Sequence, residues 1–183
     1  MDKTKKKAKT FALILCALFA ALSAILSQIM IPIGPVPVTF THVSIFIAAG
    51  LLGVKYGTLS QVVFVLLGAM GVPVFAGFTG GMGIVVGPTG GFIIGYIGCA
   101  FVTALIISRF GTSIKALIPA MCAGWVVTYS MGIPWLMHYT GLNFTAAALS
   151  CVPFIPGDLV KTVLSVIIVN RLHPVVKNMI REK

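Results

Sequence analysis

Acidic residues are almost absent from this 183-residue chain, which has 3 Asp and Glu against 13 Lys and Arg. They are Asp2, Asp158 and Glu182, so Asp158 is the single acid in the body of the sequence. This scarcity excludes enzymes that work with paired carboxylates. Charged residues make up 9% of the chain, whereas soluble domains carry about 25%. An ordinary water-soluble enzyme, a disordered chain and a coiled coil are therefore excluded as well.

Motifs for metal binding and catalysis are also missing. The four cysteines stand singly and form no CxxC pair, so the sequence has no zinc or redox framework. It contains neither HExxH nor GxSxG, and its three histidines are widely spaced. We therefore predict no catalytic residues, no metal and no cofactor.

Long apolar runs are what the sequence has instead: 58% of its residues are hydrophobic. A bilayer-spanning helix needs about 20 apolar residues, so we predict an all-α integral membrane protein with six transmembrane helices. The chain forms a single membrane domain over residues 1–183, with basic tails at 1–9 and 173–183. The predicted helices cover about 10–31, 42–54, 58–75, 88–108, 114–133 and 157–172.

Short breaks set these boundaries: a Pro-rich segment after Ile31, Lys55–Gly57, and a Gly-rich loop at 77–87. A longer, more polar stretch at 134–156 includes a further short helix at about 144–151. The amino-terminal region could also be a signal peptide. However, its apolar run continues from Phe11 to Ile31, which is long enough to span a bilayer, so we expect it to remain as the first helix.

Basic residues orient the chain. With six spans, twelve of the thirteen Lys and Arg fall on one side, and Lys161 is the exception. The positive-inside rule places this side, and with it both termini, in the cytoplasm. Basic flanks of this kind are typical of membrane proteins at an anionic leaflet, so no nucleic acid partner is expected.

Asp158 and Lys161 form the first candidate site. They lie three residues apart at the start of the last predicted helix, so they share a face. Ionisable groups in membrane segments usually face a cavity or each other. The alternative is that Asp158 caps the helix while Lys161 extends to the lipid headgroups. Capping does not explain a lysine near a helix N-terminus, so we favour contact with a polar ligand.

Three further features each have two interpretations. The Gly-rich segment 77–91 either presents backbone N–H groups to a ligand or makes a tight turn that lets two helices pack. On the first helix, the Ala17/Ala21 and Ala20/Ala24 pairs allow close approach of another helix, either internal or on a partner. The aromatic residues from Trp125 to Tyr139 form either an interfacial belt or the walls of a ligand pocket.

Two runs stand out as signatures: Gly68–Phe78 followed by GGMG at 80–83 and GPTGG at 87–91, and PFIPGDLVK at 153–161. They resemble the signatures of the BioY family, the biotin-binding S components of energy-coupling factor (ECF) transporters. Pro35–Thr39 is similar to the family's PVPxT loop, although Phe40-Thr41-His42 replaces the residues that often follow it. The resemblance covers essentially the whole chain.

The resemblance implies six helices with cytoplasmic termini and a ligand pocket that opens outside. It also implies partners in the plasma membrane of a prokaryote: a membrane scaffold (the T component) that carries two ABC ATPases. The first helix is the usual docking surface in this family, through Ala17, Ala20, Ala21 and Ala24 here.

On this basis we expect Asp158 to accept hydrogen bonds from the ureido group of biotin and Lys161 to donate to a biotin oxygen. The other expected ligand contacts are the backbone of Thr79, Gly80, Gly81 and Gly83 and the side chains of Phe75, Phe78, Tyr96 and Trp135. The alternatives are an S component for another vitamin and a helix bundle or channel that transports no vitamin.

Overall fold

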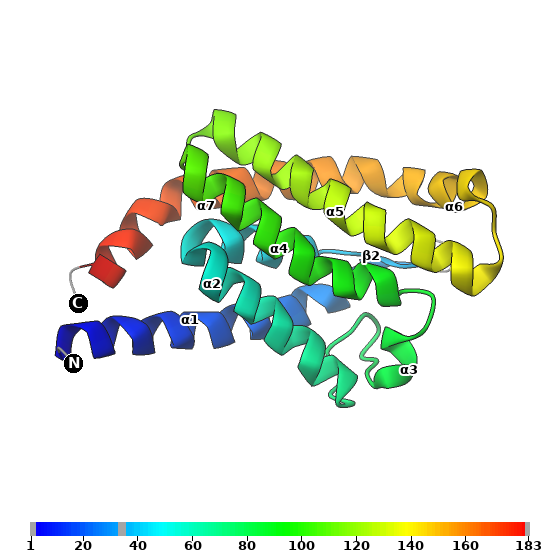
Figure 1. Cartoon of the computed structure of the whole chain (residues 1–183), viewed down its shortest axis with the longest axis horizontal. Helices are drawn as coiled ribbons and strands as arrows, with labels where there is room; N and C mark the ends of the chain where they lie inside the picture. The colour runs from blue at the N-terminus through cyan, green and yellow to red at the C-terminus, as the bar shows by residue number, and fades with distance from the viewer. Residues whose placement is uncertain (1–2, 33–35, 182–183) are drawn as a thin grey trace.

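The computed structural model describes residues 3–32 and 36–181. It is a bundle of long helices with one two-stranded sheet (Figure 1). The helices and strands are α1 (Lys3–Gln28), β1 (Met30–Ile31), β2 (Val38–Thr39), α2 (Thr41–Ala69), α3 (Met82–Val85), α4 (Gly90–Phe110), α5 (Ile114–Thr140), α6 (Phe144–Cys151), the 3-10 turn η1 (Val152–Phe154) and α7 (Ile155–Arg181).

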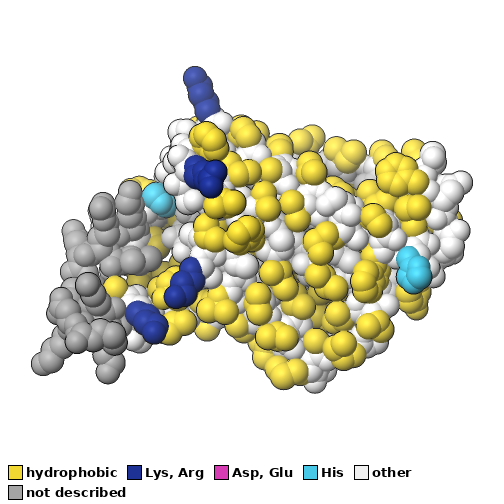
Figure 2. Space-filling model, viewed as in Figure 1, with side chains coloured by type: hydrophobic (Ala, Val, Ile, Leu, Met, Phe, Trp, Pro, Cys, Tyr) yellow, Lys and Arg dark blue, Asp and Glu magenta, His cyan; other side chains and the backbone are white. Residues whose placement is uncertain are grey.

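Within the described residues, five helical segments are long and apolar enough to cross a membrane, by length and composition. They are Lys7–Gln28, Thr41–Ala69, Gly90–Phe110, Ile114–Thr140 and Phe144–Val176. On the face shown in Figure 2, hydrophobic side chains cover most of the surface, and Lys and Arg gather toward the end of the bundle where the chain begins and ends. The prediction of a helical membrane protein is confirmed at this level.

The second and third predicted helices form the single element α2, and the predicted turn at Lys55–Gly57 is helical. The break lies at Gly53 (φ 70°, ψ −171°), a conformation that glycine adopts without the steric cost of a Cβ. A Cβ at Gly57 would lie 2.9 Å from the Ala48 carbonyl oxygen. Nine residues of straight helix would separate these positions by about 13 Å, so the chain reverses direction at Gly53.

Other helix boundaries differ from the predicted ones because helices continue through prolines and end near glycines with positive φ. α2 ends at Ala69 rather than at residue 75, and Gly71, two residues later, takes a positive φ of 99°. α5 continues through Pro134 to Thr140 and ends at Gly141, which has φ 71°. α7 starts at Ile155 and continues through Pro174 to Arg181, so most of the predicted carboxyl-terminal tail is helical. α1 covers Lys3–Gln28 instead of 10–31, and the predicted helix at 144–151 is α6.

The packing places α2 at the centre of the bundle, in contact with α1, α4 and α7, while α4 also packs along α5. The largest apolar core lies between these helices around Ile45, Phe46 and Met121, all of them fully buried. The antiparallel pairing of β1 with β2, Met30 with Thr39, lies in the connection between α1 and α2. One end of the bundle holds both the start of α1 and the end of α7 (Figure 1).

Candidate functional site

Asp158 and Lys161 form a buried ion pair in the first turns of α7. The Lys161 Nζ donates to the Asp158 Oδ1 at 3.0 Å, and the two residues are 7% and 2% exposed. The Tyr129 hydroxyl on α5 donates to the other carboxylate oxygen. Both carboxylate oxygens therefore bind side chains, and Lys161 does not extend to the surface. The pair lies inside the protein, as membrane-buried charges usually do.

Aromatic rings surround the lysine. Its Nζ lies 5.8 Å from the centre of the Phe40 ring and 5.4 Å from that of Trp125, distances at which a cation is attracted to the face of a ring. His42 stacks on Trp125, with 3.9 Å between ring centres. The His42 Nε2 lies 3.3 Å from the Thr128 hydroxyl. Residues from α2, α5 and α7 thus converge around one buried cation.

The ion pair lines a small cavity of about 30 Å³. This smaller cavity shares five lining residues with a larger cavity of about 270 Å³, so the two adjoin. The shared residues are Val36, Pro37, Thr39, Phe92 and Tyr96. The larger cavity is mostly apolar, with Phe64, Phe75, Ile84 and Ile93 in its wall. Together they approach the lower end of the size range of small-molecule pockets, roughly 300–1,000 Å³.

Six of the predicted ligand residues line these cavities. Asp158 and Lys161 line the smaller one, Phe75, Thr79 and Gly83 line the larger one, and Tyr96 lines both. The structure therefore brings together residues from three separated parts of the sequence.

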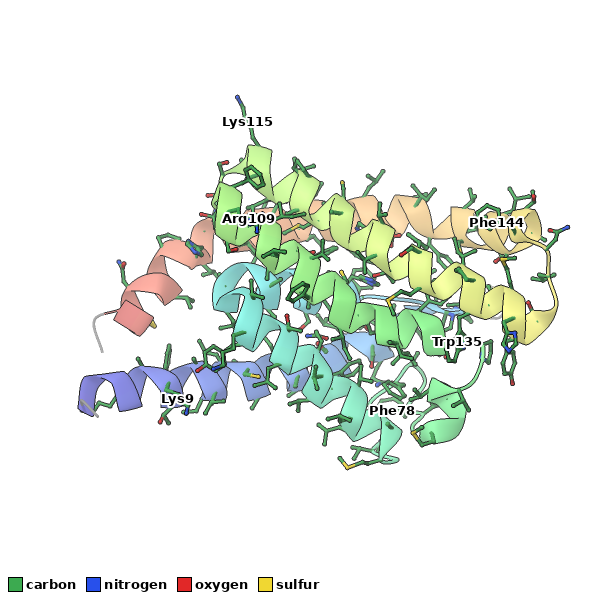
Figure 3. All side chains as sticks on the ribbon, in the orientation of Figure 1. Lys9, Phe78, Arg109, Lys115, Trp135 and Phe144 are labelled. Carbon is green, nitrogen blue, oxygen red and sulfur yellow. The ribbon has the colours of Figure 1, made fainter. Side chains whose placement is uncertain are left out.

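The other four predicted residues are not among the lining residues. Phe78 is 72% exposed and lies on the loop between α2 and α3 (Figure 3). The Gly81 N–H is used in a bond to the Gly68 carbonyl, and a Cβ at Gly80 would clash with the backbone of Val72. The Trp135 indole donates to the Gly87 carbonyl at 2.9 Å. These residues shape the loop between α2 and α4 and do not face the cavity.

Several lining residues were not predicted as ligand contacts: His42, Phe92, Trp125, Thr128 and Tyr129. Trp125 and Tyr129 belong to the aromatic series in which pocket walls were one of two alternatives. The helical spacing of Trp125, Thr128 and Tyr129, which places them on one face of α5, could have identified this wall. His42 and Phe92 lie in apolar helices that gave no signal.

The two alanine pairs of α1 have different surroundings. Ala17 and Ala21 are exposed on the outer side of the helix. Ala20 is 3% exposed and packs with Phe64 in a core cluster, and Ala24 packs against the same cluster. Ala20 and Ala24 therefore belong to the internal contact between α1 and α2, and only the other pair is open to a partner.

The fold and site define an α-helical membrane protein that encloses an apolar cavity next to a buried ion pair. The model of the BioY family matches residues 2–178, and the chain belongs to this family.

The similarity to known proteins extends over almost the whole chain. It is 42% identical to a probable biotin transporter BioY of Pyrococcus horikoshii over 167 residues, which cover 91% of this chain and 98% of the relative. It is 41% identical to the biotin transporter BioY of Thermotoga maritima, over 87% and 94% of the two chains. The crystal structure of the S-component for biotin from an ECF-type ABC transporter superposes with a TM-score of 0.88 at 31% identity, covering 95% of each chain.

Proposed function

We propose that this chain is the substrate-binding component of a biotin uptake transporter in a prokaryotic plasma membrane. Family membership and the match to a biotin S-component support this function. The single observation that carries it is the ion pair of Asp158 and Lys161 next to a mostly apolar cavity. Such a protein binds and releases its substrate unchanged, so it is not an enzyme.

The chemistry of biotin fits the two adjoining cavities. Its ureido group presents N–H donors beside a carbonyl acceptor, and the rest of the molecule is an apolar ring and chain that ends in a carboxylate. Asp158 can accept a ureido N–H while Lys161, at 3.0 Å from it, donates to the ureido oxygen. The biotin carboxylate would be repelled by Asp158, so we place it at the other end, near the backbone of Thr79 and Gly83 in the larger cavity.

Both charged groups have hydrogen-bonding capacity left for a ligand. A carboxylate has about four lone-pair positions and an ammonium has three donors. Asp158 uses one bond on each oxygen, to Lys161 and Tyr129, and Lys161 donates once to Asp158. Biotin can therefore bind without breaking the pair, which avoids the cost of leaving a buried charge alone.

The proposed topology is a single membrane domain with six spans and both termini in the cytoplasm. Because the chain reverses at Gly53, the parts of α2 before and after it count as separate spans, with the other four long segments making six. The Lys and Arg visible in Figure 2 gather at the end with the termini, which is the cytoplasmic end by the positive-inside rule. The cavities would then open to the outside.

The proposed partners are a T component and two ABC ATPases, which would supply the energy for release of biotin inside. For docking we propose the face of α1 with Ala17 and Ala21, because both side chains are exposed and small enough for close helix contact.

Biotin binding by the purified protein tests this function. We expect saturable binding that unlabelled biotin competes and that thiamin and riboflavin do not. Asp158→Asn, which keeps the size of the side chain but not its charge, should weaken binding at least tenfold, the loss expected for a charge-assisted hydrogen bond. Competition by another vitamin would indicate a different S component, and the absence of any saturable ligand would indicate a helix bundle without a transport role.

A further inference from the structure

The last turn of α1 is bonded to the loop that forms one wall of the larger cavity. We call residues 74–79 the cavity loop, because its Phe75, Ala76 and Thr79 line that cavity. Ser27 and Gln28, at the end of α1, bind the backbone of this loop some 50 positions further along the chain. Ser27 itself lines the cavity.

Both the oxygen and the nitrogen of the Gln28 side-chain amide form hydrogen bonds with the backbone of the cavity loop. Its Oε1 accepts the N–H of Phe78 at 2.8 Å. Its Nε2 lies 3.1 Å from the Phe75 carbonyl oxygen and 3.3 Å from that of Val74. The Ser27 hydroxyl also donates to the Val74 carbonyl. The pattern fixes the orientation of the amide, because a flipped amide would face its oxygen to two carbonyls.

The shape of the cavity loop needs such support. Phe78 has a positive φ of 55°, and it is the one non-glycine residue with positive φ in the described chain. A side chain with a Cβ adopts this conformation at a cost, and it persists where the surroundings enforce it. Within the loop, one backbone bond joins Phe75 to Thr79 at 2.9 Å. Gln28 binds the strained residue directly and ties it to a long helix.

We propose that Gln28, assisted by Ser27, is a positioning residue for the ligand: it holds the cavity loop as the wall of the larger cavity and ties that wall to α1. The identity of the ligand rests on the proposed function, whereas the tie between helix and loop does not. Because α1 also carries Ala17 and Ala21, a partner that moves α1 would move Phe75 and Thr79 with it. Ligand retention would then depend on the position of α1.

The test compares Gln28→Ala and Gln28→Glu with wild type, using the full-length protein in lipid nanodiscs. Glutamate still accepts from Phe78, but its second oxygen faces two carbonyls. Asn143→Ala is the matched control, since Asn143 also bonds a backbone N–H, that of Ala146 at 2.8 Å, but in α6, away from the cavities. The readouts are amide hydrogen exchange of residues 74–79, the biotin dissociation rate and the thermal unfolding midpoint.

Both Gln28 variants should speed exchange in residues 74–79 and biotin dissociation by roughly tenfold, the effect of losing a few hydrogen bonds. Their thermal midpoints should stay close to that of Asn143→Ala, which should change neither rate. If amide exchange of residues 74–79 is unchanged in a folded variant, Gln28 does not hold the cavity loop. If exchange is faster but the biotin dissociation rate is unchanged, Gln28 is not a positioning residue for the ligand. If the wild-type protein binds no biotin, the proposed function is wrong, and amide exchange alone tests whether Gln28 holds the cavity loop. If Gln28→Ala does not fold, the same comparison is made with Gln28→Glu.

Discussion

Two clusters of buried polar side chains lie inside this apolar bundle, and they differ in charge and in surroundings. The charged cluster consists of Asp158, Lys161 and Tyr129, between α5 and α7, and lines the smaller cavity. The neutral cluster consists of Ser23, Ser44 and Gln61, between α1 and α2, and all three are fully buried. It lines neither of the two adjoining cavities.

The side chains of the neutral cluster form hydrogen bonds with one another and with a nearby backbone carbonyl. Ser23 donates to the Phe19 carbonyl at 2.9 Å and lies 3.0 Å from the Ser44 hydroxyl. The Gln61 amide bonds Ser23 at 3.2 Å, and the Ser44 hydroxyl also donates to Phe19. Such hydrogen bonds between membrane helices are worth about 0.6 kcal/mol on average. This cluster therefore fixes how α1 packs on α2.

The difference separates packing from ligand recognition. A buried ion pair is a poor way to stabilise a bundle, because desolvation of two charges offsets most of their attraction. The charged cluster keeps unused donors and acceptors and lines a cavity, whereas the donors of the neutral cluster are all bonded and it lines neither of the two adjoining cavities. We therefore expect changes in the charged cluster to act on ligand affinity and changes in the neutral cluster to act on stability.

The largest effect is expected for Lys161→Met, which keeps the length of the side chain and removes its charge. Biotin affinity should fall at least about 100-fold, and the free energy of unfolding by about 3–5 kcal/mol, because Asp158 is left as an unpaired buried charge. Equilibrium binding and thermal unfolding in detergent measure the two effects.

The double variant Asp158→Asn with Lys161→Met is its control. Without an unpaired charge, most of the lost stability should return, while biotin affinity should stay at least about 100-fold below that of wild type. Wild-type affinity in the double variant would show that the pair is structural and would remove the contrast between the clusters.

Tyr129→Phe should have an intermediate effect. It removes one hydrogen bond to Asp158 but leaves the ion pair in place, so biotin affinity should fall about tenfold, in line with a hydrogen bond to a charged group. Tyr139→Phe is the matched control, because Tyr139 lies on the same helix, is 57% exposed and lines neither cavity. Equal affinities of the two variants would assign Tyr129 to packing.

The positions of charged residues made the ion pair predictable from the sequence. Asp158 and Lys161 are three residues apart on one helix, so their contact is local and follows from helix geometry. The aromatic wall depends on the contact of α5 with α7, as in the hydrogen bond between Trp125 and Thr162. Apolar spans that are hydrophobic all round do not reveal such contacts, because most of their faces look alike.

For the glycine-rich segment 77–91, the sequence predicted the irregular backbone but not which residues face the cavity. Its glycines indicated irregular backbone, and Thr79 and Gly83 do line the larger cavity. Which residue faces inward depends on local φ values: Phe78 at φ 55° is turned outward, while Phe75, three residues earlier, is 3% exposed. The break at Gly53 was misplaced for the same reason, since a single positive φ decides where the chain reverses.

Gln61→Leu should have the smallest effect on binding. Leucine removes the amide from the neutral cluster, but Ser23 keeps its bond to Phe19 and Ser60 keeps its bond to Gly57. No buried hydroxyl is thereby left alone, so the free energy of unfolding should fall by about 1 kcal/mol. Biotin affinity should stay within about twofold of wild type, well under the 1.4 kcal/mol that a tenfold change requires. Thermal unfolding and equilibrium binding on the same preparation measure both, with Ser44→Ala as a second probe of the cluster. A tenfold loss of affinity in either variant, without loss of fold, would mean that the packing of α1 on α2 is coupled to the ligand cavity through more than the last turn of α1.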